Sequence, residues 1–122
     1  MNYFLVFIGG GLGSITRFFL SKVFVPAESG FPVATFLSNT ISSFILGVLL
    51  GYFFHKQISN DNFRLLIATG FCGGFSTFST FSYETVSLVS SGNYQTAATN
   101  VFANLLLCYA AVMLGGFISK FL

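Results

Sequence analysis

Charged residues are scarce in this sequence. Asp, Glu, Lys and Arg make up 7% of its 122 residues, whereas 54% are hydrophobic and the mean hydropathy is +0.83. A soluble domain usually has about 25% charged residues, so this scarcity excludes a soluble globular protein. The net charge is only +2 and no basic cluster is present, which excludes a nucleic-acid partner. The composition therefore predicts an integral membrane protein that is surrounded by a lipid bilayer.

Residues that carry most enzyme chemistry are also scarce. The single histidine, His55, lies in a segment predicted to be a loop. The two cysteines, Cys72 and Cys108, lie inside apolar runs, where a thiol is usually a small packing residue. No nucleophile–base pair and no set of metal ligands is visible. The sequence therefore predicts a protein that is not an enzyme.

Four nearly uncharged runs are long enough to cross a bilayer, which takes about 20 residues. Short segments rich in polar residues, Pro or Gly separate them. The predicted spans are residues 3–23, 31–54, 63–90 and 94–119. We therefore expect residues 1–122 to form a single all-α domain of four transmembrane helices, with both termini on one side of the membrane.

The positively charged residues are divided almost evenly between the two sides. Lys56, Arg64 and Lys120 fall on the side of the termini, and Arg17 and Lys22 fall on the other. Orientation normally follows an excess of Lys and Arg in cytoplasmic loops. Two interpretations are open. Either the chain inserts in both orientations and two antiparallel copies pair, or the short loops simply carry few charges.

The third predicted span contains a segment, residues 70–82, that is poorly suited to an uninterrupted helix. Three glycines fall within five positions, and Ser or Thr fills most places between the Phe residues. Glycine costs about 1 kcal/mol relative to alanine in a helix interior, and Ser and Thr offer the backbone other hydrogen bonds. The sequence therefore predicts a third helix broken at mid-membrane. Irregular backbone at that depth lines a cavity or is buried in protein, and its carbonyl groups can coordinate Na⁺.

The first span carries Gly9, Gly13 and Arg17 at i, i+4 spacing. Small residues at this spacing let two membrane helices approach closely. Two interpretations of Arg17 are open. Its side chain either extends to the membrane interface from a helix end, or it places a positive charge at a wide vestibule that attracts anions.

Polar side chains form stripes on three spans. By the 3.6-residue periodicity the striped residues are Thr35, Asn39 and Ser42, then Thr77, Thr80 and Glu84, then Thr96, Asn100, Asn104 and Cys108. Such groups either hydrogen-bond neighbouring helices and stabilise the bundle, or line a polar pathway. Most of them are neutral hydrogen-bond donors and few are acidic, so a pathway among them favours an anion over a cation.

Phe78 and Phe81 lie within the same region of the third span. The edge of a phenyl ring carries positive potential and can contact an anion favourably. The chain has 18 phenylalanines, and most of them must pack against protein or lipid. The position of these two inside the Ser/Thr segment sets them apart.

The segment from Gly70 to Glu84 resembles the third-helix signature of the fluoride channels of the Fluc (CrcB) family. Residues 9–17 resemble the glycine-rich first helix of that family, and residues 35–47 resemble its second helix. The resemblance covers the whole chain. It implies a dual-topology antiparallel dimer with two pores in the inner or plasma membrane of a bacterium. It also implies passive, selective export of fluoride that protects the cell against fluoride toxicity.

The resemblance also implies roles for individual residues. Backbone carbonyls of Gly73 and Ser76 would hold a structural Na⁺, which is not transported, at the dimer centre. Phe78 and Phe81 would be the aromatic pair of the pore, and Arg17 the arginine of the vestibule. The polar residues implied for the fluoride pathway are Asn39, Ser79, Thr80 and Glu84. The family commonly has Thr in place of Ser76, a change of little consequence because the carbonyl is the ligand.

The fourth span departs from the family pattern. Asn100 and Asn104 stand where the family usually has Tyr and Ser. We predict a pore position for Asn104 from the polar stripe and not from the resemblance. The partner subunit is a second copy of the chain or a paralogous subunit. Because Asn39 and both pore phenylalanines are present, a self-pairing channel is the simpler prediction.

Two other functional classes fit a small four-span protein. A proton-coupled exporter of organic cations needs a carboxylate within the membrane, but Glu28 and Asp61 lie in predicted loops and Glu84 lies near a helix end. A structural subunit without transport activity would explain the small-residue packing but not the Ser/Thr/Phe segment. The sequence therefore favours a channel, and the family resemblance implies that its ion is fluoride.

Overall fold

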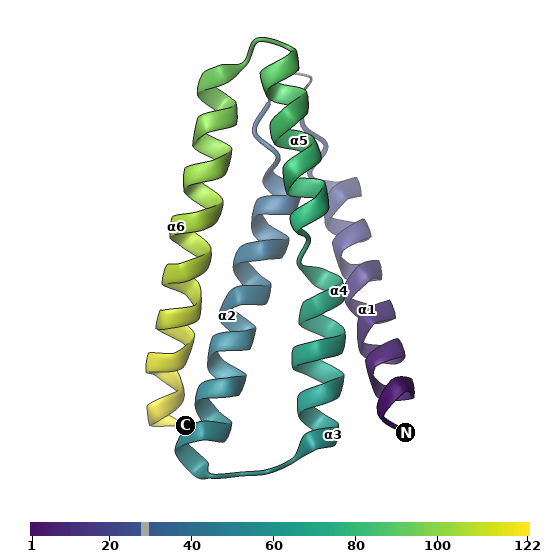
Figure 1. Ribbon diagram of the computed structural model, residues 1–122, viewed down its shortest axis with the longest axis vertical. Coiled ribbons are helices and arrows are strands. Elements are labelled where there is room, and N and C mark those ends of the chain that lie inside the picture. The colour runs from purple at the N-terminus through teal and green to yellow at the C-terminus, as the bar shows by residue number, and fades with distance from the viewer. Residues whose placement is uncertain (28–29) are drawn as a thin grey trace.

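Four membrane-spanning helical segments make up the fold. The computed structural model describes residues 1–27 and 30–122, so Glu28 and Ser29 of the first predicted loop lie outside the described residues. Every regular element within the described residues is helical, and four helical segments are long and apolar enough to span a membrane. They run alternately up and down, with both termini at the same end of the bundle (Figure 1). The chain is therefore a multi-pass membrane protein, as predicted.

The first, second and fourth spans each contain one long helix. These helices are α1 (Asn2–Val23), α2 (Val33–Lys56) and α6 (Tyr94–Ile118), the last followed by a 3₁₀ turn, η2 (Ser119–Phe121). The third span has several parts. They are α3 (Asp61–Arg64), a π-helical segment η1 (Leu65–Cys72), α4 (Gly73–Phe75) and α5 (Phe78–Ser90). The four spans begin and end within two residues of the predicted bounds.

The polar segment between the second and third spans is shorter than predicted. His55 and Lys56 belong to the last turn of α2, which ends at Gln57 in a left-handed conformation with φ of 52°. Asp61 is the first residue of α3, because the Asn60 side chain accepts a hydrogen bond from the N–H of Phe63 and caps that helix. The prediction of loop positions for His55 and Asp61 was therefore wrong.

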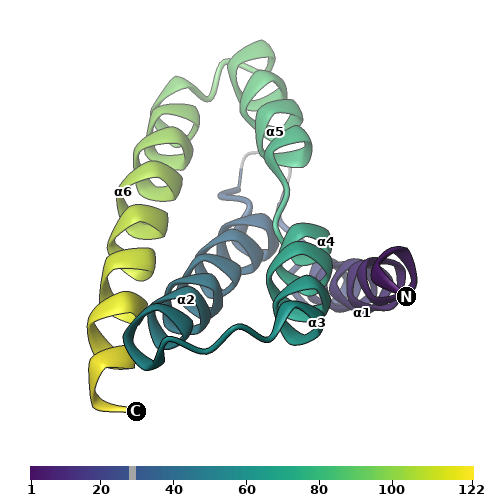
Figure 2. The same ribbon diagram turned by 60° about the horizontal axis from the view of Figure 1, so that its bottom comes forward.

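Helix α1 packs directly against the first half of the third span (Figure 2). A Cβ atom added to Gly9 would overlap the carbonyl oxygen of Leu66, and one added to Gly13 would overlap that of Phe71. Only glycine lets the two backbones approach so closely. The close approach predicted from the i, i+4 glycines is thus confirmed.

The glycines of the third span are helical, so they do not themselves interrupt the helix. Gly70 lies in η1, and Gly73 and Gly74 lie in α4. A Cβ on Gly70 or Gly74 would overlap backbone atoms of α1, so these two glycines serve packing. The residues that leave the helical conformation are Ser76, with ψ of 157°, and Thr77, with φ of −155° and ψ of 120°.

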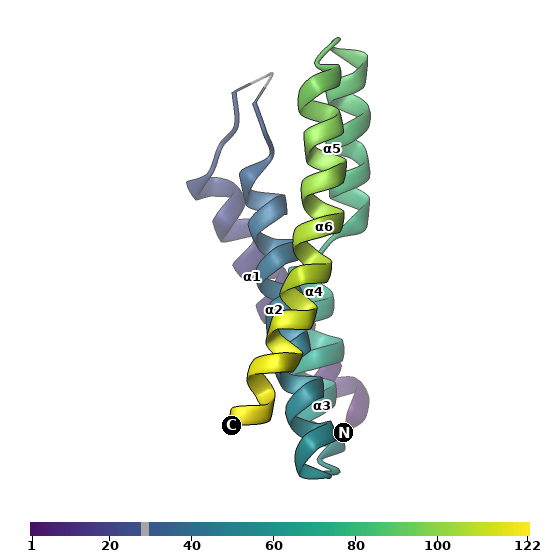
Figure 3. The same ribbon diagram turned by 90° about the vertical axis from the view of Figure 1, so that its left-hand side faces the viewer.

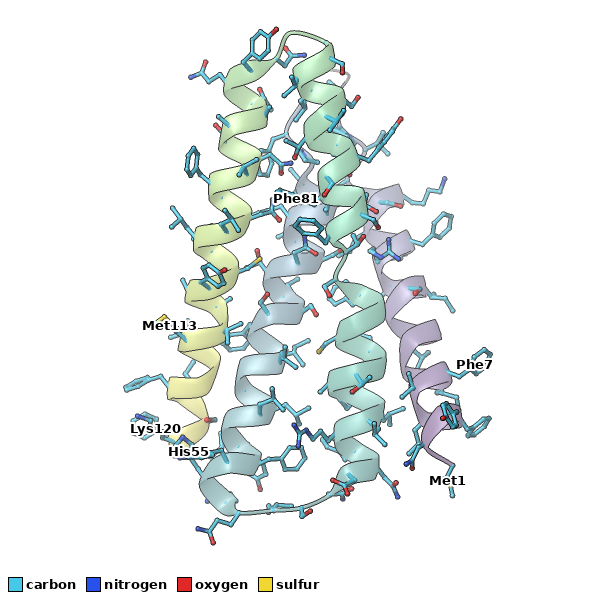
Figure 4. All side chains as sticks on the ribbon, in the orientation of Figure 1. Met1, Phe7, His55, Phe81, Met113 and Lys120 are labelled. Carbon is cyan, nitrogen blue, oxygen red and sulfur yellow. The ribbon has the colours of Figure 1, made fainter. Side chains whose placement is uncertain are left out.

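The two halves of the third span pack against different helices. The first half lies against α1, whereas α5 packs mainly against α6. Figure 3 shows α5 and the first half of α6 leaning away, at the top of the view, from the end of α1 and the start of α2. Large apolar side chains cover the outside: Phe7 and Met113 point away from the bundle and are 76% and 74% exposed (Figure 4). Such a surface suits contact with lipid.

Candidate functional site

The extended pair Ser76–Thr77 is held by a side chain from α2. The N–H of Thr77 donates to Asn39 Oδ1 at 2.7 Å, and Asn39 Nδ2 donates back to the Thr77 carbonyl at 3.3 Å. The Thr77 side chain then caps α5, because its Oγ1 accepts from the N–H of Thr80 at 3.2 Å. Side chains therefore replace two of the helical hydrogen bonds that are lost at this point.

The carbonyls of Gly73 and Ser76 are among those that lose their helical donors here. In a continuous helix the carbonyls of Gly73 and Ser76 would accept from the N–H groups of Thr77 and Thr80. These N–H groups donate instead to the side chains of Asn39 and Thr77. Gly73 is exposed on the single chain, and a Cβ there would meet nothing within 4 Å. Carbonyl oxygens that have lost their helical donors can serve as ligands of Na⁺.

The neighbouring carbonyl of Cys72, unlike those of Gly73 and Ser76, accepts several hydrogen bonds. It accepts from the N–H of Ser76 at 3.0 Å, from Ser76 Oγ at 2.7 Å and from Ser42 Oγ at 2.9 Å. The carbonyl of Gly74 accepts from Arg17 Nε at 3.2 Å. The two carbonyls named in the sequence prediction therefore differ from those of Cys72 and Gly74.

A cavity of about 250 Å³ lies beside the extended pair. Its wall includes Asn39, Thr77, Phe78, Phe81 and Asn104. The two phenyl ring centroids are 5.6 Å apart and the ring planes are tilted by 46°. Phe81 points into the bundle and is 9% exposed (Figure 4), whereas Phe78 is 78% exposed. This cavity brings together an aromatic pair, amides and a hydroxyl.

A second cavity, of about 320 Å³, lies between α1, α2 and α5. Arg17, Thr35, Thr80 and Glu84 are among its lining residues. Thr35 Oγ1 donates to Glu84 Oε1 at 2.7 Å. Glu84 Oε2 is buried and has no hydrogen-bond partner among the residues that the structure describes. The cavity thus carries one guanidinium and one carboxylate, and Arg17 Nε donates to the Gly74 carbonyl of the third span.

The polar stripes of α2 and α6 meet through amide groups. Asn39 Nδ2 donates to Asn104 Oδ1 at 3.1 Å, and Asn104 Nδ2 donates to Asn100 Oδ1 at 2.9 Å. Asn100 is completely buried and Asn104 is 5% exposed. Because Asn39 also donates to the Thr77 carbonyl, its N–H groups are engaged within the protein. Asn39 and Asn104 line the first cavity without offering an obviously free donor.

One predicted pore residue lies apart from the others. Ser79 is exposed and lines neither cavity, and its Oγ lies 3.2 Å from Thr77 Oγ1. The structure therefore brings Phe78, Phe81, Asn39 and Asn104 together at the first cavity. It brings Thr80, Glu84 and Arg17 together at the second.

Comparison with known families gives a direct match. The family model described as "CrcB-like protein, Camphor Resistance (CrcB)" matches residues 4–116. The chain belongs to the CrcB family. A relative from Pyrococcus furiosus is 51% identical over 111 residues, which cover 91% of this chain and 89% of the relative. Another from Escherichia coli K12 is 44% identical over 109 residues, which cover 89% and 86%.

Both CrcB relatives carry the name "Fluoride-specific ion channel FluC". Their name describes an ion channel, and the prediction that this chain is not an enzyme is confirmed. Thr85 of this CrcB chain was not among the predicted site residues. Its Oγ1 accepts from Asn100 Nδ2 at 2.9 Å. Only its spacing from Phe81, one helical turn earlier, could have indicated that it lies on the same face.

Proposed function

We propose that this CrcB chain is a fluoride-selective ion channel that lets F⁻ leave the cell passively and so lowers cytoplasmic fluoride. The observation that carries the proposal is the 250 Å³ cavity, where Phe78 and Phe81 meet polar groups beside the extended pair. Ring edges and hydroxyl groups favour an anion over a cation. The names of the CrcB relatives support fluoride as that anion. This function would protect the cell from fluoride toxicity.

We place the extended pair at mid-membrane, where it breaks the third helix. The third span runs from Asp61 to Ser90, a length of 30 residues, and Ser76 and Thr77 lie at its centre. Irregular backbone at this depth has to line a cavity or be covered by protein. We place the protein in the plasma membrane. Its relatives come from archaea as well as bacteria, so the bacterial inner membrane is one of the plasma membranes that this proposal covers.

We propose that a second copy of the chain, in the antiparallel orientation, covers the exposed polar backbone. Gly73 and Ser79 are exposed on the single chain at the depth where lipid offers no hydrogen bonds. Phe78 is exposed beside them. The even distribution of Lys and Arg supports insertion in both orientations. A paralogous CrcB subunit could take the place of the second copy.

We propose that the carbonyls of Gly73 and Ser76 hold a structural Na⁺ at this interface. Their release from the helical hydrogen bonds and the open space beside Gly73 support the assignment. A bound Na⁺ would supply a fixed positive charge near the anion pathway. The ion would be held by the backbone, and its site would tolerate a change in the side chain of Ser76.

The proposed function predicts fluoride efflux from liposomes that contain the purified protein. A fluoride electrode would record the efflux. A potassium ionophore starts it, because K⁺ can then leave together with F⁻ and no opposing membrane potential builds up. We expect fluoride flux to exceed chloride flux by at least about 100-fold, a discrimination of about 2.8 kcal/mol. Liposomes without protein are the control. Equal fluxes of the two anions would rule out the proposal.

The proposed Na⁺ site predicts that fluoride efflux depends on Na⁺. Replacing Na⁺ by N-methyl-D-glucamine on both sides of the membrane should reduce the efflux by at least about tenfold, because a bound structural ion is lost by mass action. Restoring Na⁺ should restore the flux, and Ser76→Thr should leave the Na⁺ dependence unchanged. Full activity in liposomes that never contained Na⁺ would show that the carbonyls do not need the ion.

A further inference from the structure

We propose that a directed row of hydrogen bonds through Asn39, Asn104, Asn100 and Thr85 fixes the position of Phe81 relative to the extended pair. Asn100 and Thr85 are then positioning residues for the ion pathway. The effect of this row on ion flow rests on the proposed function, but the row of hydrogen bonds can also be tested without transport. Each member of the row donates to the next.

The row begins and ends on the backbone of the third span. Thr77 N–H donates to Asn39 Oδ1 at 2.7 Å, Asn39 to Asn104 at 3.1 Å, and Asn104 to Asn100 at 2.9 Å. Asn100 Nδ2 donates to Thr85 Oγ1 at 2.9 Å, and Thr85 Oγ1 donates to the carbonyl of Phe81 at 2.8 Å. The path thus leaves the third span at the extended pair, crosses α2 and α6, and returns to α5 at the buried ring.

The orientation of every amide follows from the first donor. A backbone N–H can only donate, so Asn39 must present its oxygen to Thr77 and its nitrogen to Asn104. Asn104 must then present oxygen to Asn39 and nitrogen to Asn100, and the same reasoning continues to Thr85. The Thr85 hydroxyl, having accepted from Asn100, keeps its hydrogen for the Phe81 carbonyl. Reversing any one amide would oppose two donors or two acceptors, so the row has one self-consistent arrangement.

Burial makes this arrangement difficult to replace. Asn100 is completely buried, and Asn104 Nδ2 also donates to the Asn100 carbonyl at 2.9 Å. Hydrogen bonds in series polarise one another in a low-dielectric interior, so the loss of one member weakens the others. Neither Asn100 nor Thr85 lines either of the two cavities. Any effect of these two residues on ion flow must therefore act through the groups that they hold.

The test compares two substitutions of Thr85. Thr85→Val removes the hydroxyl at nearly constant volume and should lower fluoride efflux about fivefold to tenfold, the rate effect expected for one lost hydrogen bond. Thr85→Ser keeps the hydroxyl and should stay within about twofold of wild type. The matched control is Thr99→Val on α6, where an exposed Thr hydroxyl donates to the Gln95 carbonyl at 2.9 Å outside the row. If Thr85→Val has wild-type efflux, the proposal is overturned.

A double-mutant cycle separates positioning from general stability. If the row acts through Phe81, Thr85→Val should change efflux by less than about twofold in a Phe81→Ile background, because the two effects are coupled. Independent, additive losses would overturn the assignment. If Thr85→Val is not recovered at the wild-type size on gel filtration, Thr85→Ala replaces it in both comparisons.

Hydrogen exchange tests the row without any transport. Peptides covering residues 76–81 should exchange their amide hydrogens faster in Thr85→Val than in wild type, Thr85→Ser or Thr99→Val, because the local opening free energy falls. Identical exchange in all four proteins would overturn the proposal. A wild-type protein that passes no fluoride would end the proposed channel function, while the exchange comparison would still decide whether the row exists.

Discussion

Replacing Gly9 by alanine is expected to prevent α1 from packing against the third span. A Cβ at this position would overlap the carbonyl oxygen of Leu66 and lie 2.9 Å from the backbone nitrogen of Phe71. Backbone atoms cannot move aside as the end of a flexible side chain can. Overpacking a well-packed site costs about 1–3 kcal/mol, and a clash with backbone should reach or exceed the upper end of that range. We expect the variant to unfold at a clearly lower concentration of sodium dodecyl sulfate.

The matched control for this prediction lies two residues further along the same helix. A Cβ at Gly11 would meet nothing within 4 Å. Gly11→Ala should therefore leave the stability within about 0.5 kcal/mol of wild type, or raise it slightly through helix propensity. Circular dichroism during the detergent titration would measure both variants. Equal stability of Gly9→Ala and Gly11→Ala would contradict the close backbone contact.

Replacing Asn39 by leucine should both destabilise the protein and abolish most of its fluoride efflux. The change leaves the N–H group of Thr77 and the Oδ1 atom of Asn104 without their partner and removes one donor from the Thr77 carbonyl. Each buried polar group that loses its partner costs about 1–3 kcal/mol. Since Asn39 holds the extended pair beside the cavity, we expect efflux to fall by at least about tenfold, or 1.4 kcal/mol.

A neighbouring residue provides the control for Asn39. Thr40 lies next to it on α2, and among the described residues its Oγ1 makes only a 3.9 Å contact, with Cys108 Sγ. Thr40→Val should therefore change stability by less than about 0.5 kcal/mol. Efflux and detergent unfolding would be measured on the same preparations. If Asn39→Leu behaves like Thr40→Val, the amide does not hold the extended pair.

The membrane spans could be predicted because they depend on composition alone. A run such as residues 31–54 has no charged residue and is long enough to cross a bilayer, so a single sequence suffices. The role of the third-span glycines could not be predicted in the same way. Leaving the helix within lipid costs several kcal/mol per unsatisfied group, more than the helix cost of glycine. Gly70 and Gly74 therefore stay helical and provide contact with α1.

Contacts between spans were the least predictable part of the site. The stripes on α2 and α6 identified Asn39, Asn100 and Asn104 as polar positions, but periodicity does not say which amide meets which. The position of the extended pair depends on Asn39, which is distant in sequence and replaces the helical acceptor of the Thr77 N–H. Thr85 was missed because one more Thr on a membrane helix is unremarkable by itself. The pore roles of the cavity residues stay predictions until flux is measured.

The separate packing of the two halves of the third span has a mechanical consequence. The first half lies against α1 and the second half lies mainly against α6. If these two helix pairs shift relative to one another, the backbone torsions of Ser76 and Thr77 must absorb the change, since such residues act as hinges. This hinge also contains the carbonyls of Gly73 and Ser76 and lies beside the ring of Phe78. A change that restricts the backbone torsions of this hinge would therefore also restrict motion of the cavity wall.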